Sequence, residues 1–229
     1  MNNHTLSSYD RQLDQITQYI LDMGGRVKKL LEMSKTSLSE PAQELVDAAK
    51  ALDKEINSLE YKLENQATVV LALQNPMAVD LRFVTSALKV AGALERAGDL
   101  AKNTVKRSFR VGKHPVPGCL DKLESMVDII ITMLDDAISA IQSRDPKKAI
   151  QVWKRDDQVD DLYHDVLALM QKEMGVNTDS ITACTHMMFA AKNFERIADY
   201  ATDIAKTVHY IASGKPADKA LLKEAAAQA

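Results

Sequence analysis

Two stretches of this chain, one hundred residues apart, carry the same pattern of charged and small residues. Residues 95–101 read ERAGDLA and residues 195–201 read ERIADYA, so in each a glutamate is followed four residues later by an aspartate. Side chains four residues apart lie on the same face of an α-helix. The match continues in three more pairs at the same offset: Thr85 with Thr185, Ala91 with Ala191, and Lys106 with Lys206. The pattern predicts a duplicated helical unit with an acidic face in each copy.

The composition favours an all-α protein without a membrane span. Eight glycines, six prolines and 5% aromatic residues in 229 positions favour helix over sheet. The longest apolar runs, such as residues 127–134, are far shorter than the ~20 residues of a membrane helix. A net charge of -3 without a basic stripe argues against nucleic acid as a partner. Cys119 and Cys184 form no CxxC motif, and free thiols without a secretory leader lead us to expect the cytoplasm.

Six long helices are predicted from apolar positions that recur every three or four residues. They cover residues 9–38, 42–74, 77–110, 120–141, 146–175 and 180–212. Two glycines and two prolines between residues 111 and 118 indicate a linker. The predicted organisation is a first unit over 1–112, a linker over 113–118, a second unit over 119–214 and a tail over 215–229. Helices of about 30 residues, each ~45 Å long, must run antiparallel when their connections are short. We therefore predict two tandem three-helix bundles, with one continuous six-helix bundle as the alternative.

Acidic residues interrupt the apolar faces of these helices. In the fifth helix Asp156 stands where the spacing expects an apolar residue, and Asp160 follows one turn later. Asp53 stands at the equivalent place in the second helix, but Asn57 replaces the second acid. Because the second and third helices run antiparallel, as do the fifth and sixth, we expect their acidic turns to meet near mid-bundle. The predicted clusters are Asp53, Glu95 and Asp99 in the first unit, and Asp156, Asp160, Glu195, Asp199 and Asp203 in the second.

Clusters of this kind need a compensating positive charge. Two carboxylates ~6 Å apart repel each other by ~3 kcal/mol at an effective dielectric constant near 20. They must share protons, pair with Lys or Arg, or bind a metal ion. Ligands that are all oxygen suit Mg²⁺, Mn²⁺, Ca²⁺ or iron, and the larger second cluster is expected to bind more tightly. The alternative is an ordinary solvated surface, on which Arg96 and Arg196 pair with Asp99 and Asp199.

The sequence lacks the usual features of an enzyme. It has no Gly-rich phosphate-binding loop and no Glu-x-x-His motif of the ferritin-like di-iron type. It also shows no nucleophile and base in a suggestive arrangement. We expect a non-enzymatic, metal-binding protein. A carboxylate-bridged di-metal enzyme and a purely structural helical scaffold are the alternatives left open.

Four stretches carry a family resemblance: residues 75–82 (NPMAVDLR), 94–99 (LERAGD), 156–163 (DDQVDDLY) and 194–200 (FERIADY). Through them the chain resembles the PhoU family over essentially its whole length. The resemblance implies a metal motif in which an acid is followed four residues later by an aspartate. The matching pairs are Glu95 with Asp99, Asp156 with Asp160, and Glu195 with Asp199, while Asp53 retains only the first half. The metal ions implied are Mg, Mn, Fe or Zn.

The same resemblance implies a regulatory role. Members of the family are cytoplasmic negative regulators of phosphate uptake and of the phosphate-starvation response. They act as adaptors between the ATPase subunit of the phosphate ABC transporter and the sensor histidine kinase of a two-component system. They reach the membrane only through these partners, and they tend to form homodimers. We expect this role for the present chain.

Overall fold

Long helices make up almost all of the described structure. The computed structural model describes residues 2–111, 116 and 118–217, with the backbone alone for residues 2–7 and 146–148. Within these ranges there are six α-helices, one 3₁₀ turn and no β-strand. The elements are α1 (Asn2–Ser39), α2 (Gln43–Gln74), α3 (Ala78–Val111), α4 (Cys119–Ser143), α5 (Pro146–Val176), η1 (Thr178–Ser180) and α6 (Ile181–Ser213). The all-α prediction is confirmed, although α1 begins at Asn2 rather than near Tyr9.

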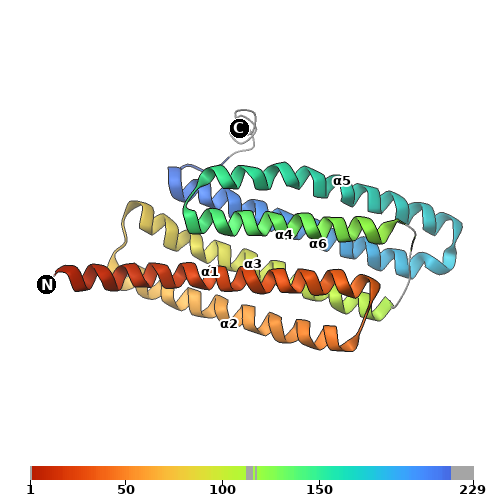
Figure 1. The fold of residues 1–229 in the computed structure, drawn as a ribbon, viewed down its shortest axis with the longest axis horizontal. Helices are drawn as coiled ribbons and strands as arrows, with labels where there is room; N and C mark the ends of the chain where they lie inside the picture. The colour runs from red at the N-terminus through yellow and green to blue at the C-terminus, as the bar shows by residue number, and fades with distance from the viewer. Residues whose placement is uncertain (1, 112–115, 117, 218–229) are drawn as a thin grey trace.

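The six helices form two antiparallel three-helix bundles that lie side by side, as Figure 1 shows. Helices α1, α2 and α3 pack on one another, and so do α4, α5 and α6. The bundles are also joined, because α1 packs on α4 and α3 packs on α6. Their buried apolar side chains form one continuous cluster. The predicted two-bundle fold is confirmed, and the two bundles share a face.

Short turns with left-handed backbone set the helix ends and hence the register between neighbouring helices. Asn75 follows α2 with φ 46°, and Pro76 cannot extend the helix. Gly118 precedes α4 with φ 76°, a conformation that costs glycine little. Gly214 ends α6 with φ 72°, and its N–H donates to the carbonyl oxygen of Tyr210. Because the α2–α3 connection is this short, α3 must fold straight back along α2.

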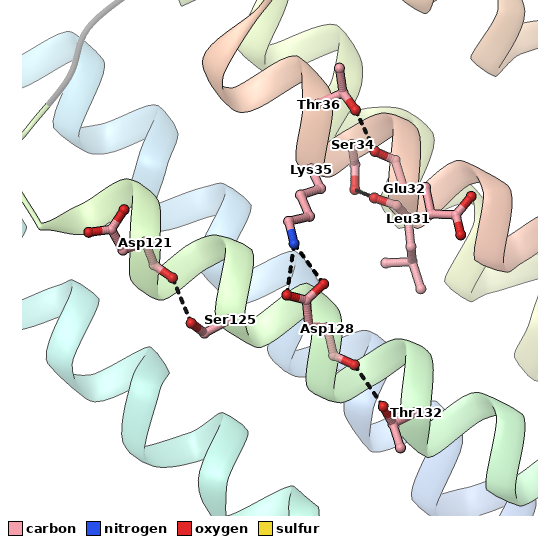
Figure 2. Close-up of polar contacts among 9 residues, drawn as sticks. All are labelled: Leu31, Glu32, Ser34, Lys35, Thr36, Asp121, Ser125, Asp128 and Thr132. Carbon is pink, nitrogen blue, oxygen red and sulfur yellow. Dashed lines mark hydrogen bonds and ion pairs between the residues drawn. The ribbon is translucent and has the colours of Figure 1, made fainter.

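The contact between α1 and α4 shows how closely the bundles approach. Lys35 Nζ lies 2.7 Å from both carboxylate oxygens of Asp128, as Figure 2 shows. Lys28 Nζ lies 2.6 Å from Asp135 Oδ2 further along the same two helices. These ion pairs are exposed, so each contributes only ~0–1 kcal/mol to the stability of the fold. They show that α1 and α4 run antiparallel, but they are not the main source of their association. At the buried side a Cβ on Gly24 would lie 2.0 Å from Ile138 Cδ1, so glycine permits the close approach of α1 to α4.

Parts of the predicted linker and tail lie outside the described residues. These are residues 113–115 and 117 of the linker and residues 218–229 of the tail. Within the described ranges, none of the helices combines the length and the apolar character that crossing a membrane requires.

Candidate functional site

The first acidic cluster lies between α2 and α3, and a lysine joins it. Asp53 is on α2, while Asp99 and Lys102 are on α3. Lys102 Nζ lies 2.9 Å from Asp53 Oδ2 and 2.6 Å from Asp99 Oδ1. The side chain of Asn103 donates to the other oxygen of Asp99 at 2.9 Å. Lys102 and Asp53 are only 12% and 13% exposed, so water screens this ion pair weakly.

Two glutamates border this first cluster, one on each helix. Burial, followed by the charges of Asp99 and Asp53, raises the pKa of Glu95. Burial, followed by the charge of Glu95, raises the pKa of Glu60 on α2. Burial alone would lower the pKa of Lys102, but its hydrogen bonds with Asp99 and Asp53 raise it. The acids of α2 and α3 therefore lie close enough to repel one another, and Lys102 compensates part of their charge.

The second acidic cluster lies between α5 and α6. Asp156 and Asp160 come from α5, and Glu195 and Asp199 come from α6. Burial, followed by the charges of Asp160 and Asp199, raises the pKa of Asp156 to about 6. Burial, followed by Glu195, raises the pKa of both Asp160 and Asp199. Asp156 therefore lies near Asp199, and Asp160 lies near Glu195, so that each pair of carboxylates repels across the two helices. This pairing is the one that the antiparallel register of α5 and α6 requires.

Two lysines of α6 each pair with one acid of the second cluster. Lys192 Nζ lies 2.5 Å from Glu195 Oε2, and Lys206 Nζ lies 2.7 Å from Asp203 Oδ1. The side chain of Asp203 is 60% exposed, so this predicted ligand lies at the solvent edge with its own lysine. In the part of the chain that the structure describes, three acids of the cluster take part in no ion pair: Asp156, Asp160 and Asp199.

The two clusters fit a metal ion to different degrees. No three His, Cys, Asp or Glu side chains of the described residues stand close enough together to hold an ion. In the first cluster Lys102 already takes oxygens of both aspartates, so a metal fits poorly. In the second cluster Lys192 pairs with Glu195 alone, and Asp156, Asp160 and Asp199 take part in none of the ion pairs of the described residues. Asp156, Asp160, Glu195 and Asp199 supply carboxylate oxygens, which are the donor type that hard cations prefer.

The structure corrects the arginine pairing considered for the alternative surface. Among the described residues, neither Arg96 nor Arg196 forms an ion pair with the aspartate three residues on. The guanidinium of Arg96 lies 5.5 Å from the centre of the Tyr200 ring. Arg196 donates to the hydroxyl of the same tyrosine at 3.4 Å. Both arginines are exposed. Their guanidinium groups contact Tyr200 instead of forming ion pairs with Asp99 and Asp199.

Two residues of the clusters are absent from the predicted ligand set. Glu60 lies two helical turns after Asp53 on the same face of α2, so the seam spacing contained the signal for it. Lys192 lies three residues before Glu195, which is the spacing of an intrahelical ion pair. Asn57, which replaces an acid of the motif, is exposed. The seam spacing therefore located the clusters correctly but did not reveal how their charges are paired.

Comparison with known proteins agrees with both the repeat and the fold. The family model described as PhoU domain matches residues 20–108 and 123–208, one match in each half of the chain. A phosphate-specific transport system accessory protein PhoU homolog of Caulobacter vibrioides is 35% identical over 216 residues, with 94% of each chain covered. The homolog of Zymomonas mobilis is 38% identical, with 93% of this chain and 90% of that protein covered.

Solved structures of two such proteins have the same arrangement of helices. The crystal structure of PhoU from Pseudomonas aeruginosa matches with a TM-score of 0.85 and 26% identity, covering 90% of this chain and all of the other. The phosphate transport system regulatory protein PhoU from Streptococcus pneumoniae matches with a TM-score of 0.81, covering 92% of this chain and 99% of the other. Since the family model matches both bundles and relatives above 30% identity span nearly the whole chain, the protein belongs to the PhoU family.

Proposed function

We propose that this protein regulates phosphate uptake as a non-catalytic adaptor. The observation that carries the proposal is the nearly full-length match to proteins named as accessory proteins of the phosphate-specific transport system. The proposed partners are the ATPase subunit of the phosphate ABC transporter and the sensor histidine kinase of the phosphate two-component system. In this role the protein represses the phosphate-starvation response from the cytoplasm while phosphate is plentiful.

Exposed apolar side chains at the ends of the bundles support binding to two partners. Leu73 and Met77, at the connection from α2 to α3, are 71% and 81% exposed. Val176 and Ile181 flank the connection from α5 to α6 and are 78% and 45% exposed. Figure 1 places these two connections at opposite ends of the long axis. Large apolar side chains grouped on a surface are typical of protein interaction sites, and helical rods present them in fixed positions.

Deletion of the gene is expected to switch on phosphate-starvation genes in phosphate-rich medium. The physical reason is that kinase and transporter lose the adaptor that couples them. A reporter fused to a starvation promoter measures the effect, and the intact gene restores repression. The double variant Leu73→Asp, Met77→Asp is expected to keep helicity but to lose capture of the purified ATPase subunit or kinase, because a charge replaces the apolar contact. Normal repression in the deletion strain would contradict the adaptor role.

We further propose that the second bundle binds a hard divalent cation. Its three carboxylates without an ion pair, and their raised pKa values, support this proposal, because a cation relieves their mutual repulsion. When bound, the ion would supply positive charge that draws α5 and α6 together. The contribution of this chain is to hold Asp156 and Asp160 on one helix opposite Glu195 and Asp199 on the other.

Calorimetric titration of chelator-treated protein with Mn²⁺ is expected to give saturable heat. The double variant Asp156→Ala, Asp199→Ala is expected to lose at least ~90% of the affinity, since charged oxygen ligands supply most of the binding energy. Asp128→Ala is the matched control, because it removes an exposed acid that faces Lys35 outside the cluster. Absence of heat with the parent protein would instead favour the structural scaffold. Oxygen consumption or phosphatase turnover by the Mn²⁺-loaded protein would favour the di-metal enzyme.

A further inference from the structure

The two acidic clusters differ in charge at one largely enclosed position of the α3/α6 repeat. Lys102 in α3 corresponds, one hundred residues later, to Thr202 in α6, although the preceding acids Glu95 and Asp99 are retained as Glu195 and Asp199. We propose that the ammonium group of Lys102 is the permanent cation of the first bundle, so that a metal ion binds only in the second bundle. This inference rests on the metal binding proposed above. It assigns to Lys102 the role of excluding the metal ion from the first bundle.

The contacts of Lys102 place its charge where a metal ion would have to lie. Its Nζ atom bridges an aspartate on α2 and an aspartate on α3, at 2.9 Å from Asp53 and 2.6 Å from Asp99. Asn103 takes the second oxygen of Asp99, so both oxygens of that carboxylate are engaged. With 12% of its side chain exposed, Lys102 is largely enclosed. A divalent ion would have to displace the ammonium group and then remain close to it, which electrostatic repulsion disfavours.

The second bundle has no such group at the corresponding position. The hydroxyl of Thr202 donates to the backbone carbonyl oxygen of Asp199, at 2.7 Å, and carries no charge. The nearby Lys192 and Lys206 bond to Glu195 and Asp203 rather than to the three remaining acids.

The acid content of the two clusters agrees with this difference. Asp160 is part of the second cluster, whereas its counterpart Asn57 is neutral and exposed. Glu60 in the first cluster, whose counterpart is Tyr163, offsets this missing acid. The main difference is therefore the enclosed ammonium group of Lys102, which bridges two helices, whereas Lys192 of the second bundle pairs only with Glu195. Neutral Asn57 and the bridging Lys102 both favour the metal-free state of the first bundle.

Exchanging the two residues tests the inference directly. Mn²⁺ is titrated calorimetrically into the chelator-treated parent, Lys102→Thr and Thr202→Lys proteins, while fluorescence of Trp153 is recorded. This single tryptophan lies three residues before Asp156, so it reports on the second bundle. The parent is expected to bind one equivalent with a fluorescence change. Lys102→Thr is expected to bind a second equivalent without a further change, and Thr202→Lys is expected to bind none.

The controls separate this inference from the metal proposal itself. Lys106→Thr removes a lysine that both copies retain, and it is expected to leave one equivalent. If circular dichroism shows that Lys102→Thr has lost helicity, Lys102→Met is used in its place. Methionine removes the charge of Lys102 but retains an aliphatic side chain of similar length. A parent that already binds two equivalents, or a Lys102 variant that still binds one, would overturn the inference while metal binding stands. A parent that binds none, with a Lys102 variant that binds one without a tryptophan signal, would overturn the second-bundle site and with it the selection between two sites. No binding by any of these proteins would overturn both.

Discussion

Replacement of Phe194 by alanine is expected to lower the free energy of unfolding by about 3–5 kcal/mol. Phe194 is fully buried in α6, at the position where the first copy has buried Leu94. Truncation removes its apolar contacts and leaves a cavity that the long helices around it cannot close by moving independently. Because Phe194 directly precedes Glu195, the same change is expected to loosen the second cluster. Urea unfolding followed by circular dichroism measures the loss.

The matched control for this prediction is Phe109→Ala on α3. Phe109 is 41% exposed, so its truncation removes less contact and is expected to cost about 1 kcal/mol or less. Equal losses in the two variants would show that burial in the shared core does not govern the stability of the bundles.

Replacement of Asp156 by asparagine is expected to stabilise the metal-free protein at neutral pH by about 1–2 kcal/mol. The pKa of Asp156 rises from its ordinary value of 3.8 to about 6, because of burial and then the charges of Asp160 and Asp199. At full value such a change corresponds to about 3 kcal/mol, and solvent screening of this half-buried group reduces it. Asp157 adds to the repulsion and Lys206 opposes it. Urea unfolding in the presence of a chelator measures the gain.

The pH dependence follows from the direction of the pKa change. Between about pH 4 and pH 6 the folded protein binds more protons at Asp156 than the unfolded chain does, so stability falls as the pH rises through this window. Asp160 and Asp199 contribute in the same direction. Asp156→Asn is expected to flatten this fall. A fall of the same size in the variant and the parent would contradict the assignment.

Asp53→Asn is the counterpart in the first bundle and is expected to have the opposite sign. Asp53 bonds to largely enclosed Lys102, so its removal leaves a positive charge with one partner fewer. Breaking an ion pair removed from water leaves an uncompensated charge and destabilises the fold. Equal effects of the two asparagine variants would show that Lys102 does not distinguish the clusters.

Much of the architecture was predictable because helix periodicity is a local property. Apolar residues at three-four spacing located all six helices, and the repeat of residues 95–101 at 195–201 located the two bundles. The acids of the clusters were found in the same way, since Asp53 and Asp156 fall on positions where the helix faces its neighbour. The alternative in which Arg96 and Arg196 pair with Asp99 and Asp199 does not match the structure, where both arginines contact Tyr200. The contact of Arg196 with Tyr200 spans one turn of α6, whereas Arg96 lies on α3 and meets Tyr200 only through the packing of the two bundles.

The sequence by itself determined which segments are helices, that the unit is duplicated, and which helical faces carry acids, because each follows from the fixed 3.6-residue turn. Only the tertiary structure decided that the bundles share one core along α1–α4 and α3–α6. It also decided that Lys102 reaches across to Asp53, a residue 49 positions away on another helix. That contact depends on the antiparallel register of α2 and α3, and such register is set by the packing of all their side chains together rather than by any local pattern.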